Sequence, residues 1–393
     1  MLLNTASQSS THVDFDLHGL VGVRLIDPTP SDVVAVEKQL GLAQTELLRE
    51  PDVTLRFVKR LPTSSPLRYV NLGETGFTRD AFVVFRGKDQ ARKGVQIPFE
   101  QLGGLCELVC ESGLSEVPLL VAIINLTALV NGALPLHASA FVFHNTGVLA
   151  TGWSKGGKTE TLLGFAAHGA RYIGDDWVYL CEGGQTMCGM PEPLTTWDWH
   201  LRQLPGLRAK VSSRQRRRLW MLRQLSGAIS TTQGTGIHGN GNMNRLLDLV
   251  KRQQFVKLPP QHVFGPQWGE LQAPIDCVFF VGCHEAAEIE AEPVEPDEVA
   301  ARMAFSLEEE RSRILSYYRS FRFAFPHKCN TWLERAAAME RERLATFLKG
   351  KTAYAVRHPY PFCLEDLRRA VEPYIAAAST ARPHHLELTE AEL

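Results

Sequence analysis

The sequence lacks any long run of hydrophobic residues. Its longest apolar stretch, residues 117–130, contains Asn125, and a helix needs about 20 mostly apolar residues to cross a bilayer. We therefore interpret this stretch as a buried helix. The first residues also lack the basic start and long apolar stretch of a secretory signal peptide. We expect a cytoplasmic protein that has no membrane partner.

The sequence also lacks paired cysteine motifs and an excess of charge of either sign. None of its eight cysteines belongs to a C-x-x-C pair, and no cysteine–histidine cluster has the spacing of a zinc site. Reduced, mostly buried thiols are therefore expected. The formal net charge is −1, which argues against a general attraction to nucleic acid.

One strong motif stands out. Residues 152–159 read Gly-Trp-Ser-Lys-Gly-Gly-Lys-Thr, which fits G-x-x-x-x-G-K-T. A short apolar strand is expected before the motif, and a helix closed by Gly169 is expected after it. A strand, a glycine-rich loop and a helix form the context of a phosphate-binding P-loop. The motif therefore predicts that the chain binds the phosphates of a nucleotide.

Each residue type in this loop has a chemical role. Gly156 and Gly157 allow backbone N–H groups to point inward at a helix N-terminus, where the helix dipole favours anions. Lys158 supplies a positive charge to the β- and γ-phosphates, and Thr159 supplies a hydroxyl ligand to Mg²⁺. The predicted nucleotide-binding residues are Gly152, Ser154, Lys155, Gly156, Gly157, Lys158, Thr159 and Glu160.

A second feature is the pair Asp175-Asp176. It lies between two apolar stretches, residues 170–174 and 177–180, which both read as strand. Adjacent carboxylates inside an apolar strand are costly unless a charge or a metal compensates them. Alone, such a pair favours a turn cap or an arginine partner. Beside a P-loop it favours phosphoryl transfer, in which one Asp accepts a hydroxyl proton and the other holds metal or water.

Residues 134–176 resemble the HPr kinase/phosphorylase family. In order they contain His137 on a strand, the P-loop ending in Gly-Lys-Thr-Glu, Gly169 and the tandem Asp175-Asp176. The resemblance implies a P-loop kinase core related in topology to phosphoenolpyruvate carboxykinase. It also implies that Asp175 is the catalytic acid/base, that Asp176 and Glu160 lie near the metal, and that His137 lies close to the transferred phosphoryl group.

The chain departs from that family in one motif. The family's second signature, Arg-Gly-x-Gly-Ile-Ile-Asn, has its nearest echo at residues 233–239, which lack the Arg and the Asn. The resemblance therefore extends to the kinase core but not to the phosphocarrier HPr as substrate, nor to the reverse phosphorylase reaction. Related kinases form homo-oligomers, but that property does not depend on the matched motifs.

Three parts are expected along the chain. Residues 1–112 read as a small mixed, mostly β domain, residues 113–375 as the α/β P-loop kinase domain, and residues 376–393 as a flexible tail. The kinase domain carries a basic insertion at about residues 198–230 and a Gly/Asn-rich loop at 234–244.

The two special segments of the kinase domain allow several interpretations. The basic insertion could be the solvated face of an amphipathic helix, because Leu219, Leu222 and Leu225 have helical spacing. It could instead clamp an acidic substrate or nucleotide phosphates, or bind nucleic acid, which is the weakest interpretation because no aromatic–basic interleaving accompanies it. The Gly/Asn-rich loop is either a linker or a lid that excludes water from the γ-phosphate.

Taken together, these features predict a kinase. It would transfer the γ-phosphoryl group of Mg²⁺·ATP to a hydroxyl, most favourably on a Ser or Thr of a protein or peptide. The alternatives are a kinase for an amino-acid or sugar hydroxyl, and a nucleotide-dependent binding or regulatory protein. The predicted catalytic residues are Asp175, Lys158 and His137, and the predicted metal ligands are Thr159, Asp176 and Glu160.

Overall fold

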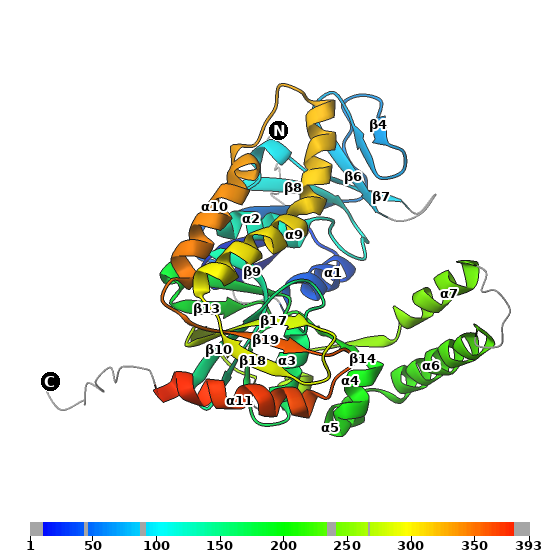
Figure 1. Ribbon diagram of the computed structural model, residues 1–393. Coiled ribbons are helices and arrows are strands. Elements are labelled where there is room, and N and C mark those ends of the chain that lie inside the picture. The colour runs from blue at the N-terminus through cyan, green and yellow to red at the C-terminus, as the bar shows by residue number, and fades with distance from the viewer. Residues whose placement is uncertain (1–10, 43–45, 87–91, 234–240, 266–267, 381–393) are drawn as a thin grey trace, which may run out of the picture.

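Two large β-sheets organise the fold, one formed within residues 12–111 and the other within residues 134–358 (Figure 1). The structure is a computed structural model that describes residues 11–42, 46–86, 92–233, 241–265 and 268–380. Within these ranges the sheets combine parallel and antiparallel pairs and are covered by helices. The α/β class predicted from the sequence is therefore confirmed.

The N-terminal sheet has the strand order β1-β2-β3-β8-β7-β6-β5-β4. Helix α1 (Pro30–Leu40) packs Val36 and Leu40 into the same core as this sheet. It begins where Thr29 and Asp32 cap each other and Pro30 occupies the first turn. Strands are the main regular elements of the described residues between 11 and 112. The strands are β1 (His12–Leu17), β2 (Val21–Ile26), β3 (Val53–Val58), β4 (Arg68–Asn71), β5 (Thr75–Phe77), β6 (Phe82–Arg86), β7 (Lys93–Gln96) and β8 (Cys106–Glu111).

The second sheet has the order β16-β13-β12-β9-β10-β17-β19-β18, and β11 also pairs with β9. Strand β10 is central and fully buried, with β9 antiparallel on one side and β17 parallel on the other. The strands are β9 (Leu134–Phe143), β10 (Thr146–Thr151), β11 (Arg171–Gly174), β12 (Trp177–Cys181), β13 (Thr186–Gly189), β16 (Gln272–Pro274), β17 (Cys277–Cys283), β18 (Glu290–Pro293) and β19 (Thr352–His358).

Helices cover both faces of this second sheet, because successive residues of its central strand are apolar and point to opposite faces. One core contains α2 (Leu120–Val130), α9 (Pro296–Ala324) and α10 (Thr331–Leu348). The other contains α3 (Lys158–Ala166) and α11 (Leu364–Thr380). Helix α2 is the buried helix predicted from the longest apolar run. No helix in the described ranges has the length and apolar character needed to cross a membrane.

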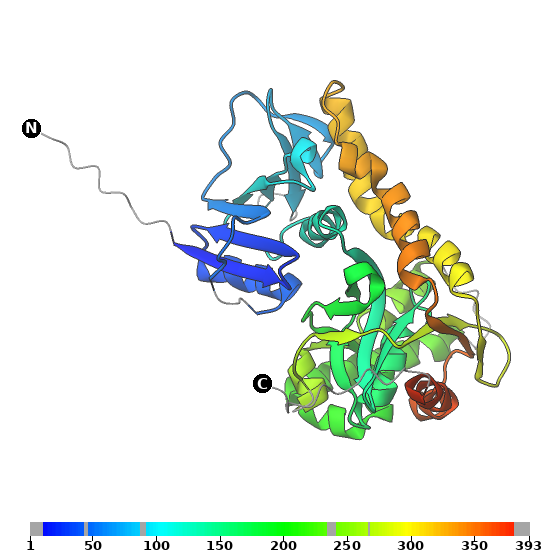
Figure 2. The same ribbon diagram turned by 90° about the vertical axis from the view of Figure 1, so that its left-hand side faces the viewer.

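The long helices α9 and α10 run beside both sheets (Figure 2). Phe321 of α9 stacks on Phe99 with ring centroids 5.4 Å apart and meets Phe82 edge-on at 5.8 Å. Asn330 caps α10 by accepting a hydrogen bond from the Leu333 N–H. Its amide also donates to the carbonyls of Phe99 and Leu102. These contacts fix the N-terminal sheet to the rest of the molecule.

The basic insertion lies between the two strands of a small ribbon, β14 (Leu194–Trp197) and β15 (Phe255–Leu258). It is helical, as one interpretation predicted, but Leu225 is 48% exposed and does not share the buried face of Leu219. The helices between these two strands are α4 (Asp198–Gln203), α5 (Pro205–Lys210) and α6 (Ser213–Gln233), which cover the predicted insertion, and α7 (Gly241–Lys251), which follows it.

Two predicted boundaries are wrong. Of the predicted loop 234–244, residues 241–244 form the first turn of α7, while 234–240 lie outside the described residues. Helix α11 continues to Thr380, so the predicted tail includes five helical residues at 376–380. The helix continues because Ala378 packs into the core, which outweighs the small, polar composition that suggested a tail. The rest of the tail, 381–393, lies outside the described residues.

Candidate functional site

The P-loop connects β10 to α3, in the strand–loop–helix context that the motif predicts. Gly152 has φ +149°, and a Cβ there would lie 2.2 Å from the Val281 carbonyl oxygen of the adjacent strand β17. Gly157 has φ +106°, and a Cβ there would lie 2.2 Å from Nε2 of His358. Both the backbone conformation and the lack of space therefore require glycine at these two positions.

His358 lies buried beneath the loop at the end of β19. Its Nε2 is 2.9 Å from the Gly156 carbonyl oxygen, and its Nδ1 is 2.8 Å from the Pro359 carbonyl oxygen. The ring therefore occupies the space beneath the turn that a Cβ at Gly157 would need.

A cleft of about 870 Å³ opens over the loop. Lys158 is buried, and its Nζ donates to the carbonyls of Gly152 at 3.2 Å and Trp153 at 2.9 Å. Burial lowers the pKa of Lys158, while Glu310 and the neighbouring aspartates oppose this effect. The predicted nucleotide-binding residues that line the cleft are Ser154, Lys155, Gly157, Lys158, Thr159 and Glu160. Gly152 and Gly156 approach the Val281 carbonyl instead.

The two aspartates lie in a break between strands, which corrects the prediction of one continuous strand. Strand β11 ends at Gly174 and β12 begins at Trp177, and both strands pair with β9. Because β11 and β12 pair with different parts of β9, Asp175 and Asp176 form the connection between β11 and β12. Asp175 is buried, whereas Asp176 is exposed and has φ +64°. Only one of the two carboxylates is therefore removed from water.

Asp175 is held by two hydroxyl groups. Ser139 of β9 donates to its Oδ1 at 2.5 Å, and Thr159 of the P-loop donates at 3.0 Å to Oδ1 and 3.2 Å to Oδ2. Burial and the adjacent charge of Asp176 raise the pKa of Asp175 to about 7, although both hydroxyl bonds act in the opposite direction. A carboxyl group with a pKa near neutrality can both accept and release a proton.

His137 lies on the other side of Asp176. Its Nε2 is 3.8 Å from Asp176 Oδ1, and its Nδ1 is 2.5 Å from Oε1 of Glu310 on α9. The hydrogen bond with His137 lowers the pKa of Glu310, against the opposing effect of burial. The His137 ring also lies 5.9 Å from the indole of Trp177, its pairing partner in β12. Glu310 therefore keeps a negative charge that orients the imidazole.

Glu160 has a different partner. The fully buried His200 of α4 accepts a hydrogen bond from the Trp197 N–H at Nδ1, so its Nε2 donates to Glu160 Oε1 at 3.1 Å. Burial favours a raised pKa for Glu160, but this bond and nearby positive charge lower it overall. The first helix of the insertion is thus attached directly to the helix that follows the P-loop.

The predicted metal ligands Thr159, Asp176 and Glu160 all line the cleft. Among the described residues, no three or more His, Cys, Asp or Glu side chains form a group that could hold a metal ion. Thr159 bonds to Asp175 and Glu160 to His200. The structure therefore brings the three residues to one cleft without assembling them into a metal cage.

Sequence reasoning missed four side chains of this site. Ser139 carried a signal, because the two-residue strand period places it on the same face as His137. Glu310, His200 and His358 carried none, because each is distant in the sequence and lies in no motif. Trp197, Trp199, Tyr360, Lys251 and Arg252 complete the wall of the cleft from elements far from the P-loop.

The chain was also compared with known proteins. A scan against protein-family models finds no match for this chain, and a search of curated proteins finds none either. The function proposed below therefore rests on the chemistry of the site.

Proposed function

We propose that this protein is an ATP-dependent kinase with a P-loop core of the HPr kinase type, acting on a hydroxyl group, most favourably a Ser or Thr of a protein or peptide. One observation carries the proposal: Thr159 of the P-loop donates a hydrogen bond to the buried carboxylate of Asp175. This contact joins a phosphate cradle to a candidate base. Phosphoryl transfer to an alcohol needs these two parts side by side.

The donor side of the site fits a nucleotide with Mg²⁺. The glycine turn leaves no room for a Cβ at Gly152 or Gly157, which suits a loop that folds its N–H groups around phosphate. Lys158 would hold the β- and γ-phosphates, and the oxygens of Thr159 and Asp176 suit Mg²⁺. Mg²⁺ needs only one or two protein ligands when phosphates supply others, and it would offset charge on the transferred group.

The acceptor side is supplied by Asp175 and its neighbours. Because the pKa of Asp175 is raised to about 7, its carboxylate is basic enough to take the proton of an attacking hydroxyl. Ser139 fixes the position of this carboxylate from β9. His137, oriented by Glu310, lies beside Asp176, where it would interact with the phosphoryl group during transfer.

The proposal is tested with labelled ATP. The full chain is incubated with Mg²⁺, ATP labelled at the γ-phosphate and a cell lysate, and the products are separated by mass. Label on protein that resists hydroxylamine and withstands acid identifies a phosphorylated hydroxyl, and the label disappears with Lys158→Ala. Tight ATP binding without labelled product or ADP above background would refute the kinase and favour a nucleotide-dependent binding protein.

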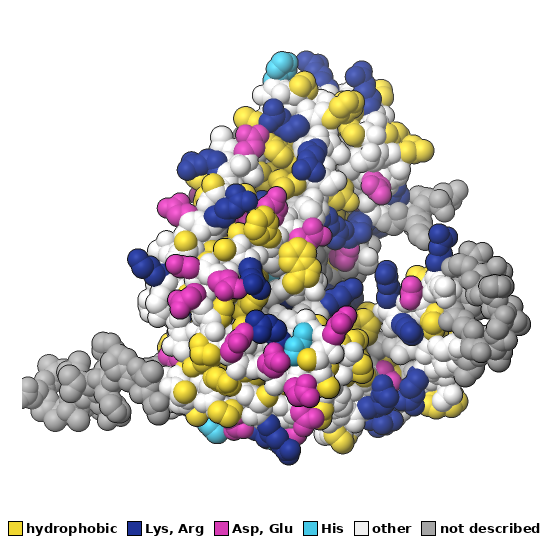
Figure 3. Space-filling view, in the orientation of Figure 1, with side chains coloured by type: hydrophobic (Ala, Val, Ile, Leu, Met, Phe, Trp, Pro, Cys, Tyr) yellow, Lys and Arg dark blue, Asp and Glu magenta, His cyan; other side chains and the backbone are white. Residues whose placement is uncertain are grey.

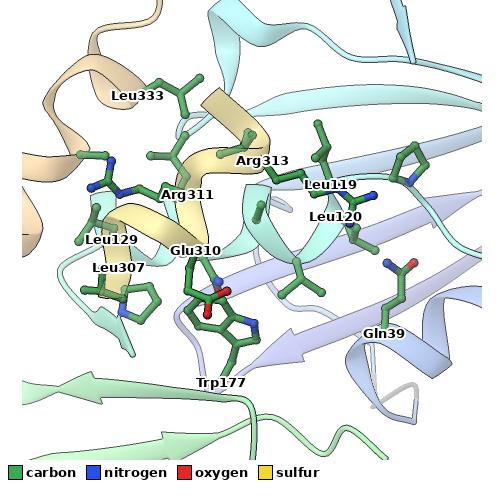
Figure 4. A pocket seen from close by; sticks show the side chains of 18 of the residues that line it. Gln39, Leu119, Leu120, Leu129, Trp177, Leu307, Glu310, Arg311, Arg313 and Leu333 are labelled. Carbon is green, nitrogen blue, oxygen red and sulfur yellow. The ribbon is translucent and has the colours of Figure 1, made fainter. Parts of the chain in front are cut away.

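A small-molecule acceptor is the second candidate, and a specific cavity favours it. A cavity of about 270 Å³ lies between α2, α9 and α10. Trp177 and Glu310 both belong to its wall (Figure 4), and Glu310 bonds to His137 of the main cleft. An amino-acid or sugar derivative bound here would lie next to the catalytic residues. In the labelling experiment, label would then appear on a low-mass product.

A further inference from the structure

The insertion forms a helical arm, defined here as α6 and α7, which projects away from the two sheets (Figure 1). Ile229 of α6 packs with Leu247 and Val250 of α7 in a small core of the arm's own. At its base, Gln254 donates to Ser226 Oγ at 2.8 Å, and Arg223 lies 3.4 Å from Asp198. The arm is thus anchored to the ribbon β14–β15 that borders the nucleotide cleft.

The arm lies in the most basic part of the chain. Residues 199–247 contain no Asp or Glu, although the whole chain has a formal net charge of −1. On α6, Arg214 and Arg217 are exposed, and within the described ranges neither forms an ion pair. Lys and Arg side chains gather over this region in the space-filling view (Figure 3). The basic residues of the segment are Arg202, Arg208, Lys210, Arg214, Arg216, Arg217, Arg218, Arg223 and Arg245.

Large apolar side chains share the outer surface with these arginines. Five such residues of the arm expose between 45% and 57% of their surface, and they are Trp220, Met221, Leu225, Leu246 and Leu249. Side chains three or four residues apart lie on the same face of a helix. This spacing in α6 places four residues along one face, namely Arg217, Trp220, Met221 and Leu225. A face that mixes exposed aromatic, Met and Arg side chains has the composition of a protein interface.

The base of the arm reaches the reaction site. Ser226 of α6, Lys251 of α7 and the adjacent Arg252 line the same cleft as Lys158 and Asp176. A partner bound along the arm would therefore be delivered beside the P-loop. This position distinguishes the arm from a surface patch that is remote from the chemistry.

We propose that the arm is a docking surface for the protein acceptor, and that it binds an acidic amphipathic segment of that protein. The inference rests on the proposed kinase function and specifies the substrate class. The basic charge requires an acidic partner. Exposed Leu and Met side chains have no role in holding phosphates, which favours a protein over nucleic acid. A second copy of the arm would bring like charges together.

Binding to the arm can be measured without any phosphoryl transfer. The probe is a fluorescent peptide of 20 residues, roughly one helix of 30 Å, with Leu at helical spacing and Glu elsewhere. Its binding to the full chain is measured by fluorescence anisotropy. Reversing two exposed charges with R214E/R217E should weaken binding about tenfold. The matched control R319E/R335E reverses the charges of two exposed arginines on α9 and α10 and should leave peptide binding unchanged.

The apolar part of the surface is tested by W220S/L225S, which should also weaken peptide binding about tenfold while circular dichroism and ATP affinity stay unchanged. Equal binding by wild type, R214E/R217E and W220S/L225S would overturn the proposal. The proposal would also be overturned if a single-stranded RNA of 20 nucleotides bound more tightly than the peptide and its affinity were unchanged by W220S/L225S. Lys158→Ala should still bind the peptide, so failure of docking and failure of the kinase are distinguishable.

Discussion

Replacing Asp175 with Asn separates the proposed base from everything else in the site. The Asn side chain has nearly the same shape, and its Oδ1 can accept the hydrogen bonds that Ser139 and Thr159 now donate. It cannot take a proton from a hydroxyl. General base catalysis contributes about 10²–10⁴-fold, so kcat should fall by that factor. ATP affinity should stay within about threefold, because the P-loop is intact.

The same variant should be more stable than the wild type, in a pH-dependent way. The Asp175 carboxyl keeps its proton up to about pH 7 in the folded protein but loses it near 3.8 when unfolded. Between these values the folded state binds more protons, so the free energy of unfolding of the wild type falls as pH rises. The full difference corresponds to about 4 kcal/mol, of which about 2 kcal/mol develops between pH 5.5 and 8.

Urea unfolding of both proteins at pH 5.5 and pH 8, without nucleotide or divalent metal, measures this difference. The advantage of Asp175→Asn should grow by about 2 kcal/mol over that range. An advantage that does not change with pH would show that burial leaves the carboxyl of Asp175 unperturbed. Turnover within about threefold of wild type would show that Asp175 is not the base.

Asp80 provides the matched control. It also accepts hydrogen bonds from two hydroxyls, Ser64 at 2.5 Å and Thr78 at 2.9 Å, but it lies in the N-terminal sheet region and its pKa is lowered, first by the Ser64 bond. Asp80→Asn should therefore leave kcat unchanged and should give no stabilisation that grows with pH. A loss of turnover equal to that of Asp175→Asn would indicate a general effect on folding.

Three further predictions concern the residues around this base. Lys158→Ala should weaken ATP binding at least tenfold and lower turnover at least 10²-fold, because the same positive charge contributes to ATP binding and to catalysis. Calorimetry measures the ATP affinity and a coupled ADP assay measures turnover. A loss of affinity alone, or of turnover alone, would contradict this dual role. Glu310→Gln should lower kcat about tenfold at unchanged KM for ATP, because His137 loses a charged partner. Steady-state kinetics measure both constants, and an unchanged kcat would mean that Glu310 has only a structural role. Gly157→Ala should abolish measurable ATP binding, because the new Cβ clashes with His358 beneath the loop. The control Gly169→Ala, also at positive φ but with open space around it, should cost only about 1 kcal/mol of stability. ATP binding by Gly157→Ala would contradict the geometry of the turn.

The sequence by itself predicted the elements that have strong local signals. The strand β10, the glycine turn and α3 follow from the spacing of Gly152, Gly157 and Lys158, because glycine freedom and a helix N-terminus act over a few residues. The buried helix α2 was likewise found from its local apolar pattern. Asp175 and Asp176 were identified as a pair from the residues alone, and the family resemblance distinguished their roles, with Asp175 as the acid/base and Asp176 near the metal.

Only the tertiary structure decided which carboxylate is buried and what surrounds it. The register of β11 and β12 on β9 leaves Asp175 inside and Asp176 outside, and no local pattern encodes a register set by three strands. Glu310, His200 and His358 reach the site from α9, α4 and β19. Their positions depend on how distant elements pack, so the partners that tune the site could not be identified from spacing along the chain.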